Sequence, residues 1–212
     1  MKLTVITPCI APTRNYIRLL DESAKRQGIE LDTFGIGQPF VDWRHMLLTY
    51  TVPEMKRLHN EGVTHVLYVD GRDSLFVAPL AEIMRKYHEL DAPACLMSAD
   101  DQAPLEAKVN AGGYVGELDY LIDLWTGLAL RHTDDADYQN WLWKEWPVQG
   151  ITCDVTCAIF QSVDGGVATN GGRFVNTVTG SHPCVLHFRG GYSDPVTGRE
   201  HRIKPVLEAL YG

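Results

Sequence analysis

Residues 64–69 (THVLYV) constrain the fold of this chain more than any other segment. The run is almost continuous in apolar and β-branched side chains, which is typical of a strand covered on both faces. Asp70 and Gly71 follow it at once, and both residue types commonly end strands in turns. The segment therefore predicts a strand that is buried on both faces, as in a layered α/β fold.

Strand-like and helix-like segments alternate on either side of this run. The strand-like segments are residues 3–7, 30–36 and 94–98, and the helix-like segments are residues 13–27, 43–60 and 79–90. Pro53 is expected to kink or interrupt the second of these helices, because proline lacks an N–H group. The alternation favours a parallel sheet flanked by helices.

The second half of the chain has a more mixed pattern. A glycine-punctuated turn and strand at 110–116 is followed by predicted helices at 118–131, 135–145 and 204–211 and by short strands near 158–161, 173–177 and 184–188. No repeat, linker or low-complexity tract divides the sequence. A chain of 212 residues can bury a substantial core as one unit, so we expect a single domain over residues 1–212.

The charge balance limits the classes of partner. The chain has 27 Asp and Glu against 19 Lys and Arg, for a formal charge of −8. A general binder of nucleic-acid backbones needs the opposite balance, because phosphate contacts come from Lys and Arg. The basic tract at 199–204 (REHRIK) leaves a local contact with a polyanion open, and a solvated helix start is the alternative.

Cysteine spacing and hydropathy bear on the cellular setting. Five cysteines without a C-x-x-C pair favour buried thiols over a zinc site or a disulfide framework. The first residues predict a strand rather than a signal peptide, because their apolar run is too short. No segment approaches the ~20 apolar residues of a membrane span, so we expect a cytoplasmic protein.

Two carboxylates follow directly on this predicted buried strand, in Asp70-Gly71-Arg72-Asp73. Ligand sites in open α/β sheets lie at the carboxyl ends of the strands. Two carboxylates three residues apart on a glycine-containing turn can face one point, and their oxygens suit Mg²⁺ or Mn²⁺. The alternative is an ordinary solvated turn, in which Asp and Gly are also common.

Two further segments carry groups of functional chemistry. His187 ends a predicted strand and is followed by Arg189 and Gly190, so an imidazole ligand and phosphate contacts are one interpretation and a core histidine beside a glycine turn is the other. Residues 133–139 (TDDADYQ) hold several carboxylates at a predicted helix start. Those carboxylates either serve a sugar donor or acceptor, or only cap the helix.

The order of these segments resembles a known family. VLYVDGRD, NAGGYVG, DDADYQ, AIFQ and VLHFRG follow one another as in the GT-A glycosyltransferase domain of procollagen lysyl hydroxylases and its collagen galactosyltransferase-like, viral and bacterial relatives. The resemblance covers residues 3–192 and is strongest over 66–188. It implies a Rossmann-like GT-A fold for nucleotide sugars, with a mixed, mostly parallel sheet flanked by helices. It also implies metal-dependent transfer of a sugar from a UDP-sugar to an acceptor hydroxyl.

The resemblance assigns roles position by position. Asp70, Asp73 and His187 correspond to the ligands of Mn²⁺ (or Mg²⁺), which holds the diphosphate. The positions implied to face the nucleotide or the donor sugar are Thr7, Arg72, Asn110, Gly112 and Gly113, and Arg189 and Gly190 are expected near the phosphates. Asp134 and Asp135 correspond to the acidic pair on the sugar and acceptor side, where we place catalysis.

The sequence departs from the family at several places, among them Arg72, where the family often has Tyr, and Ala136, where it has Gln. Two whole segments also differ. The Gly-rich, Lys-containing stretch before the second helix is replaced by residues 42–45 (DWRH), and the segment between Ser98 and Asn110 is short. The acceptor is therefore open: a hydroxylated protein side chain, a glycan, a lipid-linked glycan or a hydroxymethylated DNA base. Two rival functions also remain, a metal-dependent nucleotidyltransferase or phosphohydrolase and a non-catalytic nucleotide-sugar-binding protein.

Overall fold

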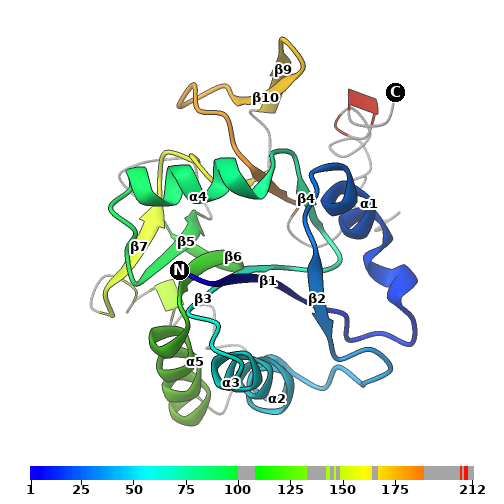
Figure 1. Ribbon diagram of the computed structural model, residues 1–212, viewed down its shortest axis with the longest axis vertical. Helices are drawn as coiled ribbons and strands as arrows, with labels where there is room; N and C mark the ends of the chain where they lie inside the picture. The colour runs from blue at the N-terminus through cyan, green and yellow to red at the C-terminus, as the bar shows by residue number, and fades with distance from the viewer. Residues whose placement is uncertain are drawn as a thin grey trace.

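The computed structural model describes residues 1–99, 108–132, 142, 143, 146, 149–163, 167–188, 206, 208 and 209. Its centre is a six-stranded sheet in the order β2-β1-β3-β6-β5-β7, with helices on both faces (Figure 1). The six strands are β1 (Leu3–Pro8), β2 (Leu31–Phe34), β3 (His65–Val69), β5 (Cys95–Ala99), β6 (Val109–Glu117) and β7 (Ile151–Asp154). The α/β class and the predicted strand at residues 64–69 are therefore confirmed, and the structure places that strand in the interior of the sheet.

One strand departs from the parallel arrangement that the alternation favours. β1 runs parallel to β2 and β3, and β5 runs parallel to β7, but β6 is antiparallel to both β3 and β5. Only residues 100–108 separate β5 from β6, whereas a parallel crossover needs roughly a dozen residues or more. The short connection explains the antiparallel pairing.

A second sheet of three strands has the order β4-β11-β8. It contains β4 (Ser74–Phe76), β8 (Phe160–Ser162) and β11 (Val185–His187), and a separate hairpin of β9 (Val167–Asn170) and β10 (Arg173–Asn176) stands away from the body (Figure 1). β4, β7 and β9 are not predicted from the sequence. These strands have only three or four residues, which is a weak pattern, although β8, β10 and β11 of the same length are predicted.

The helices divide between the two faces of the large sheet. They are η1 (Arg14–Ile17), α1 (Arg18–Arg26), α2 (Trp43–Met46), the π-helical turn η2 (Leu47–Thr51), α3 (Val52–Asn60), α4 (Leu80–Glu89) and α5 (Leu118–Arg131). Val66 and Tyr68 of β3 pack on the side of α3 and α5, whereas Leu67 and Val69 pack on the side of α1 and α4. Both faces of β3 are thus buried, which explains its unbroken apolar sequence.

The helical path over residues 43–60 is continuous through Pro53. The Val52 N–H donates to the Leu47 carbonyl, five residues back, and so closes a π turn before the proline. The wider turn lets the chain accommodate a residue that lacks its own N–H and crowds the preceding turn. The expected disturbance is therefore a local π turn rather than a break.

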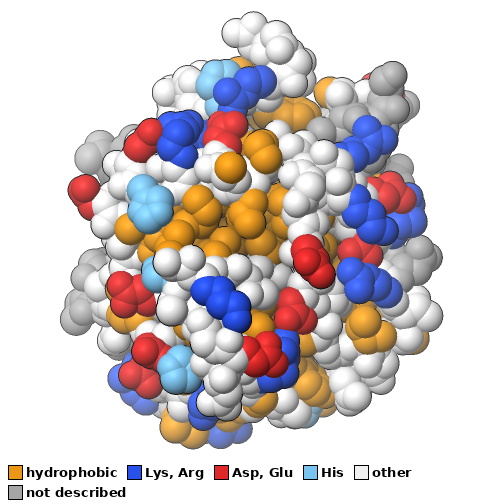
Figure 2. Space-filling model, in the orientation of Figure 1, with side chains coloured by type: hydrophobic (Ala, Val, Ile, Leu, Met, Phe, Trp, Pro, Cys, Tyr) orange, Lys and Arg blue, Asp and Glu red, His pale blue; other side chains and the backbone are white. Residues whose placement is uncertain are grey.

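The buried side chains form two main clusters, one on each face of the large sheet. All five cysteines are buried thiols outside any disulfide, as the sequence predicts. Hydrophobic side chains also gather at the surface between α4 and the central strands (Figure 2). Among the described residues, no helix is both long enough and apolar enough to cross a membrane.

Candidate metal-binding site

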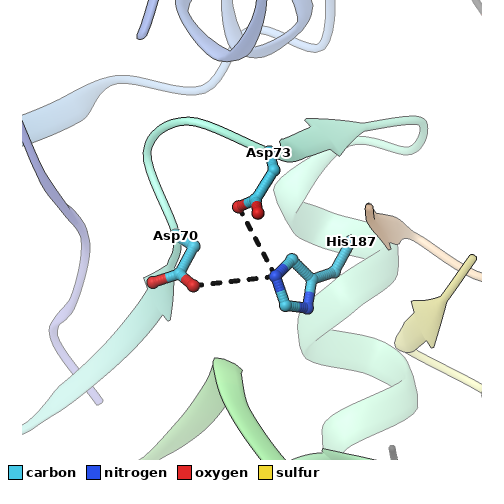
Figure 3. A group of neighbouring side chains, drawn as sticks. All are labelled: Asp70, Asp73 and His187. Carbon is cyan, nitrogen blue, oxygen red and sulfur yellow. Dashed lines mark ion pairs between the residues drawn. The ribbon is translucent and has the colours of Figure 1, made fainter. Parts of the chain in front are cut away.

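Asp70, Asp73 and His187 come together at the carboxyl end of β3 (Figure 3). The His187 Nε2 atom lies 3.6 Å from Asp70 Oδ2 and 3.4 Å from Asp73 Oδ1. One ligand atom from each residue lies within 4.8 Å of the others, and in the part of the chain that the structure describes this is the one group of its kind. The structure therefore places the three predicted metal ligands in one cluster.

Pairing within the small sheet brings Asp73 and His187 together. Ser74, the first residue of β4, is the register partner of His187, the last residue of β11. The Phe188 N–H donates to the Asp73 carbonyl at 2.7 Å and extends this pairing by one step. The pairing of β4 with β11, which are far apart in sequence, thus places Asp73 and His187 next to each other.

Gly71 allows the turn between the aspartates to lie against β1. A Cβ atom at Gly71 would lie 2.2 Å from the Pro8 carbonyl oxygen and 3.0 Å from Thr7 Oγ1. Thr7 is fully buried under this turn, where its hydroxyl donates to the Val69 carbonyl at 2.9 Å. Arg72, by contrast, is exposed. Both residues were predicted to contact the nucleotide. Thr7 is instead packed under the turn, whereas Arg72 lies at the surface.

The glycines of β6 form a seat for the imidazole of His187. The pairing of β6 with β5 shifts in register, so that residues 111–113 have no partner in β5 and bulge out. A Cβ atom at Gly112 would lie 2.2 Å from His187 Cε1, and one at Gly113 would lie 2.7 Å from Phe160 Cδ1. Two side chains of the small sheet therefore pack directly on the β6 backbone.

Hydrogen bonds hold this bulge in register with the aspartate turn. The Gly112 N–H donates to Asn110 Oδ1 at 2.8 Å, and the Asp70 N–H donates to the Gly112 carbonyl at 2.9 Å. Asn110, Gly112 and Gly113, which were predicted to face the donor sugar, thus form the strand segment beside the cluster of Asp70, Asp73 and His187.

The three side chains of the cluster are mostly buried, so two carboxylates lie close together with little access to water. The Asp70 side chain is 22 % exposed, that of Asp73 12 % and that of His187 6 %. Burial and then repulsion from Asp73 raise the pKa of Asp70 to about 6, while His187 and the Tyr68 hydroxyl act in the opposite direction. Carboxylate oxygens and an imidazole nitrogen are a donor set that Mn²⁺ accepts, so the residues present fit a divalent cation.

Four predicted site residues lie outside the described residues: Asp134, Asp135, Arg189 and Gly190. One contact of the site was not anticipated, from the Tyr68 hydroxyl to Asp70 Oδ1 at 3.0 Å. The two-residue period of a strand, which places Tyr68 and Asp70 on the same face of β3, would have indicated it.

Comparisons with known proteins show the fold alone. No family model matches the chain, and no curated protein matches it. Among solved structures, the chain is similar to a glycosyltransferase described as involved in the glycosylation of the major capsid of PBCV-1. The similarity covers 98 % of this chain and 100 % of that chain, with a TM-score of 0.60 and 12 % sequence identity. The resemblance to lysyl hydroxylase domains is not shown by these comparisons and stays a prediction.

Proposed function

We propose that this chain is a metal-dependent glycosyltransferase of the GT-A type, which moves a sugar from a nucleotide sugar to an acceptor hydroxyl. One observation carries the proposal: a cluster of two carboxylates and an imidazole lies at the carboxyl end of a central strand, in a fold shared over almost its whole length with a glycosyltransferase. Ligands of α/β sheets bind at that edge. The sequence resemblance favours a UDP-sugar as the donor.

In this proposal, Asp70, Asp73 and His187 hold Mn²⁺ or Mg²⁺. When bound, such an ion supplies positive charge that neutralises the diphosphate leaving group. Gly71 lets the aspartate turn lie against Pro8 and Thr7, and Gly112 lets the imidazole of His187 pack on the β6 backbone, so both glycines help to bring the three ligands together. The exposed guanidinium of Arg72 extends from the same turn, and we assign it to the ribose, the base or the diphosphate.

We assign catalysis to two carboxylates that were identified from the sequence motif DDADYQ. Asp134 and Asp135 are proposed to stabilise the cationic character of the sugar carbon or to take the acceptor proton. Arg189 and Gly190 directly follow the strand of His187 and its neighbour Phe188, and we assign them to the phosphates. These assignments rest on the order of motifs in the sequence.

For the acceptor, we favour a hydroxyl on a protein or glycan. The solved structure with the same fold is described as involved in the glycosylation of a major capsid, and this favours a protein or glycan acceptor over DNA. A DNA base as acceptor would need contacts to backbone phosphates, and the charge of −8 disfavours them.

Release of nucleoside diphosphate from a panel of nucleotide sugars tests the proposal. We expect release from one nucleotide family in the presence of Mn²⁺, increased by hydroxyl-bearing acceptors and abolished by EDTA. Asp73→Asn should abolish it, whereas Glu82→Gln, a change of the same chemistry on α4, should leave it intact. Hydrolysis of nucleoside triphosphates without sugar release would instead favour a phosphohydrolase. Binding of a nucleotide sugar without turnover, with every acceptor class, would favour the non-catalytic binding protein.

A further inference from the structure

A hydrogen bond from the Tyr68 hydroxyl restrains the side chain of Asp70. Asp70 is anchored at its backbone, because its N–H donates to the Gly112 carbonyl at 2.9 Å. Its side chain still has two torsions, and either carboxylate oxygen could face the cluster. The Tyr68 hydroxyl donates to Oδ1 at 3.0 Å, and Oδ2 is the oxygen on the side of His187 Nε2, 3.6 Å away. Tyr68 therefore selects which oxygen faces the other two ligands.

The phenol ring is itself held in place by a stack of aromatic rings. Tyr68 lies parallel to Tyr114 of β6, with ring centroids 4.5 Å apart and an interplanar angle of 5°. Tyr114 in turn contacts Trp125 of α5 at 5.1 Å between centroids. All three residues are at most 2 % exposed. A ring packed in this way cannot swing, so its hydroxyl is a fixed donor rather than an adaptable one.

We propose that Tyr68 is a positioning residue of the metal site, which turns Asp70 so that Oδ2 faces the cation held with Asp73 and His187. This inference rests on the proposed function, because it requires a cation at that cluster. Groups that orient metal ligands in this manner typically contribute about 10- to 100-fold to metal affinity. We expect an effect of that size from a residue that never contacts the metal.

Tyr68→Phe is the informative variant, because it removes the hydroxyl and keeps the ring in its stack. Tyr114→Phe is the matched control, since it removes a hydroxyl from the adjacent ring of the same stack. The dissociation constant for Mn²⁺ is measured on the full chain after removal of metal, by titration with detection of free Mn²⁺ by electron paramagnetic resonance. Melting curves in EDTA give the stability of each variant, and the titrations are run at a temperature well below the lowest transition.

We expect Tyr68→Phe to weaken Mn²⁺ binding about 10- to 100-fold and Tyr114→Phe to change it less than about threefold. Equal Mn²⁺ affinity in wild type and Tyr68→Phe would overturn the proposal, as would a fall in melting temperature in EDTA with unchanged affinity, which indicates a merely structural role. Equal weakening by both variants would also overturn it. If the wild-type chain itself binds no Mn²⁺, Mg²⁺ or Co²⁺, the proposed function fails together with this inference, and that outcome is distinct from the others.

Discussion

The carboxylates of Asp70 and Asp73 lie close together and are only partly accessible to water. Such an arrangement costs free energy in the absence of a cation, because like charges repel and burial disfavours the charged form. The pKa of Asp70, raised to about 6, expresses this cost. Sites that perform chemistry often carry strain of this kind at the expense of stability.

The raised pKa of Asp70 predicts how pH acts on the metal-free protein. Between the ordinary value of 3.8 and about 6, the unfolded chain has lost the Asp70 proton while the folded chain retains it. Raising the pH through this window therefore lowers the stability of the metal-free fold, since the unfolded state binds fewer protons. A bound cation keeps Asp70 charged and removes this loss, so Mn²⁺ should raise the melting temperature more at pH 7 than at pH 5. Melting curves at both pH values, with Mn²⁺ and with EDTA, check this; a larger increase at pH 5 would contradict it.

Asp73→Asn should separate stability from metal binding. The change removes one of two neighbouring charges, so we expect a melting temperature in EDTA at pH 7 that equals or exceeds that of wild type. We also expect Mn²⁺ to give no stabilisation. A large loss of stability in EDTA would show instead that Asp73 has mainly a structural role.

At the scale of secondary structure, β6 is the element that shapes the site. Its bulge over residues 111–113 turns a strand into a surface on which His187 and Phe160 pack. A β-bulge that re-aims backbone beside a functional group is a recurrent device. The two consecutive glycines of the NAGGYVG segment are explained by close approach, since any side chain there would enter the space of these rings.

Gly112→Ala tests this account of β6. The added Cβ would meet His187 Cε1 at 2.2 Å, so either the imidazole or the β6 backbone must move, and the spacing of the three ligands changes. We expect a loss of about 1–3 kcal/mol in stability from overpacking and a loss of at least about tenfold in Mn²⁺ affinity. Gly127→Ala is the control, because its nearest neighbour atom would lie 3.6 Å away within α5. That helix-interior change should stabilise by about 0.5–1 kcal/mol and leave Mn²⁺ binding unchanged.

Asp154, the last residue of β7, holds the turn that leads to β8. Asp154 is 2 % exposed, and its two carboxylate oxygens accept the N–H groups of Ala158, Ile159 and Phe160 at 2.8–2.9 Å. Asp154→Asn replaces one acceptor oxygen with an amide donor, which leaves at least one buried N–H facing another donor. We expect a loss of about 1–3 kcal/mol in the free energy of unfolding, measured by urea denaturation. A change below about 0.5 kcal/mol would refute the structural role.

The secondary-structure elements with long hydrophobic patterns could be predicted from the sequence. The candidate site could be predicted only where its residues directly follow such an element. β3 was evident from its apolar run, and the Asp70 turn was placed by its position after that strand. The seat of His187 on Gly112 could not be predicted, because it depends on a register shift between β5 and β6. Nor could the pairing of β4 with β11, since three-residue strands carry no pattern that specifies a partner.

Across the whole molecule, the site lies where the two sheets meet. Asp70 follows β3 of the large sheet, whereas Asp73 directly precedes β4 and His187 ends β11 in the small sheet. Gly112, in β6 of the large sheet, lies against the His187 ring. A cation at the cluster would therefore link both sheets, and its binding should stabilise the whole fold rather than one loop. The shared fold with a glycosyltransferase extends over the same 98 % of the chain.

The most direct test of the central claim is thermal melting with a panel of nucleotide sugars and nucleoside diphosphates, each with Mn²⁺ and with EDTA. A ligand that binds only the folded state stabilises it by about 2.7 kcal/mol at a hundredfold excess over its Kd, or about 5–10 °C for a domain of this size. We predict such an increase with one nucleotide family, UDP first among them, only with Mn²⁺, and none in Asp73→Asn. If no nucleotide raises the melting temperature under either condition, the assignment of this site to a nucleotide-sugar donor is wrong.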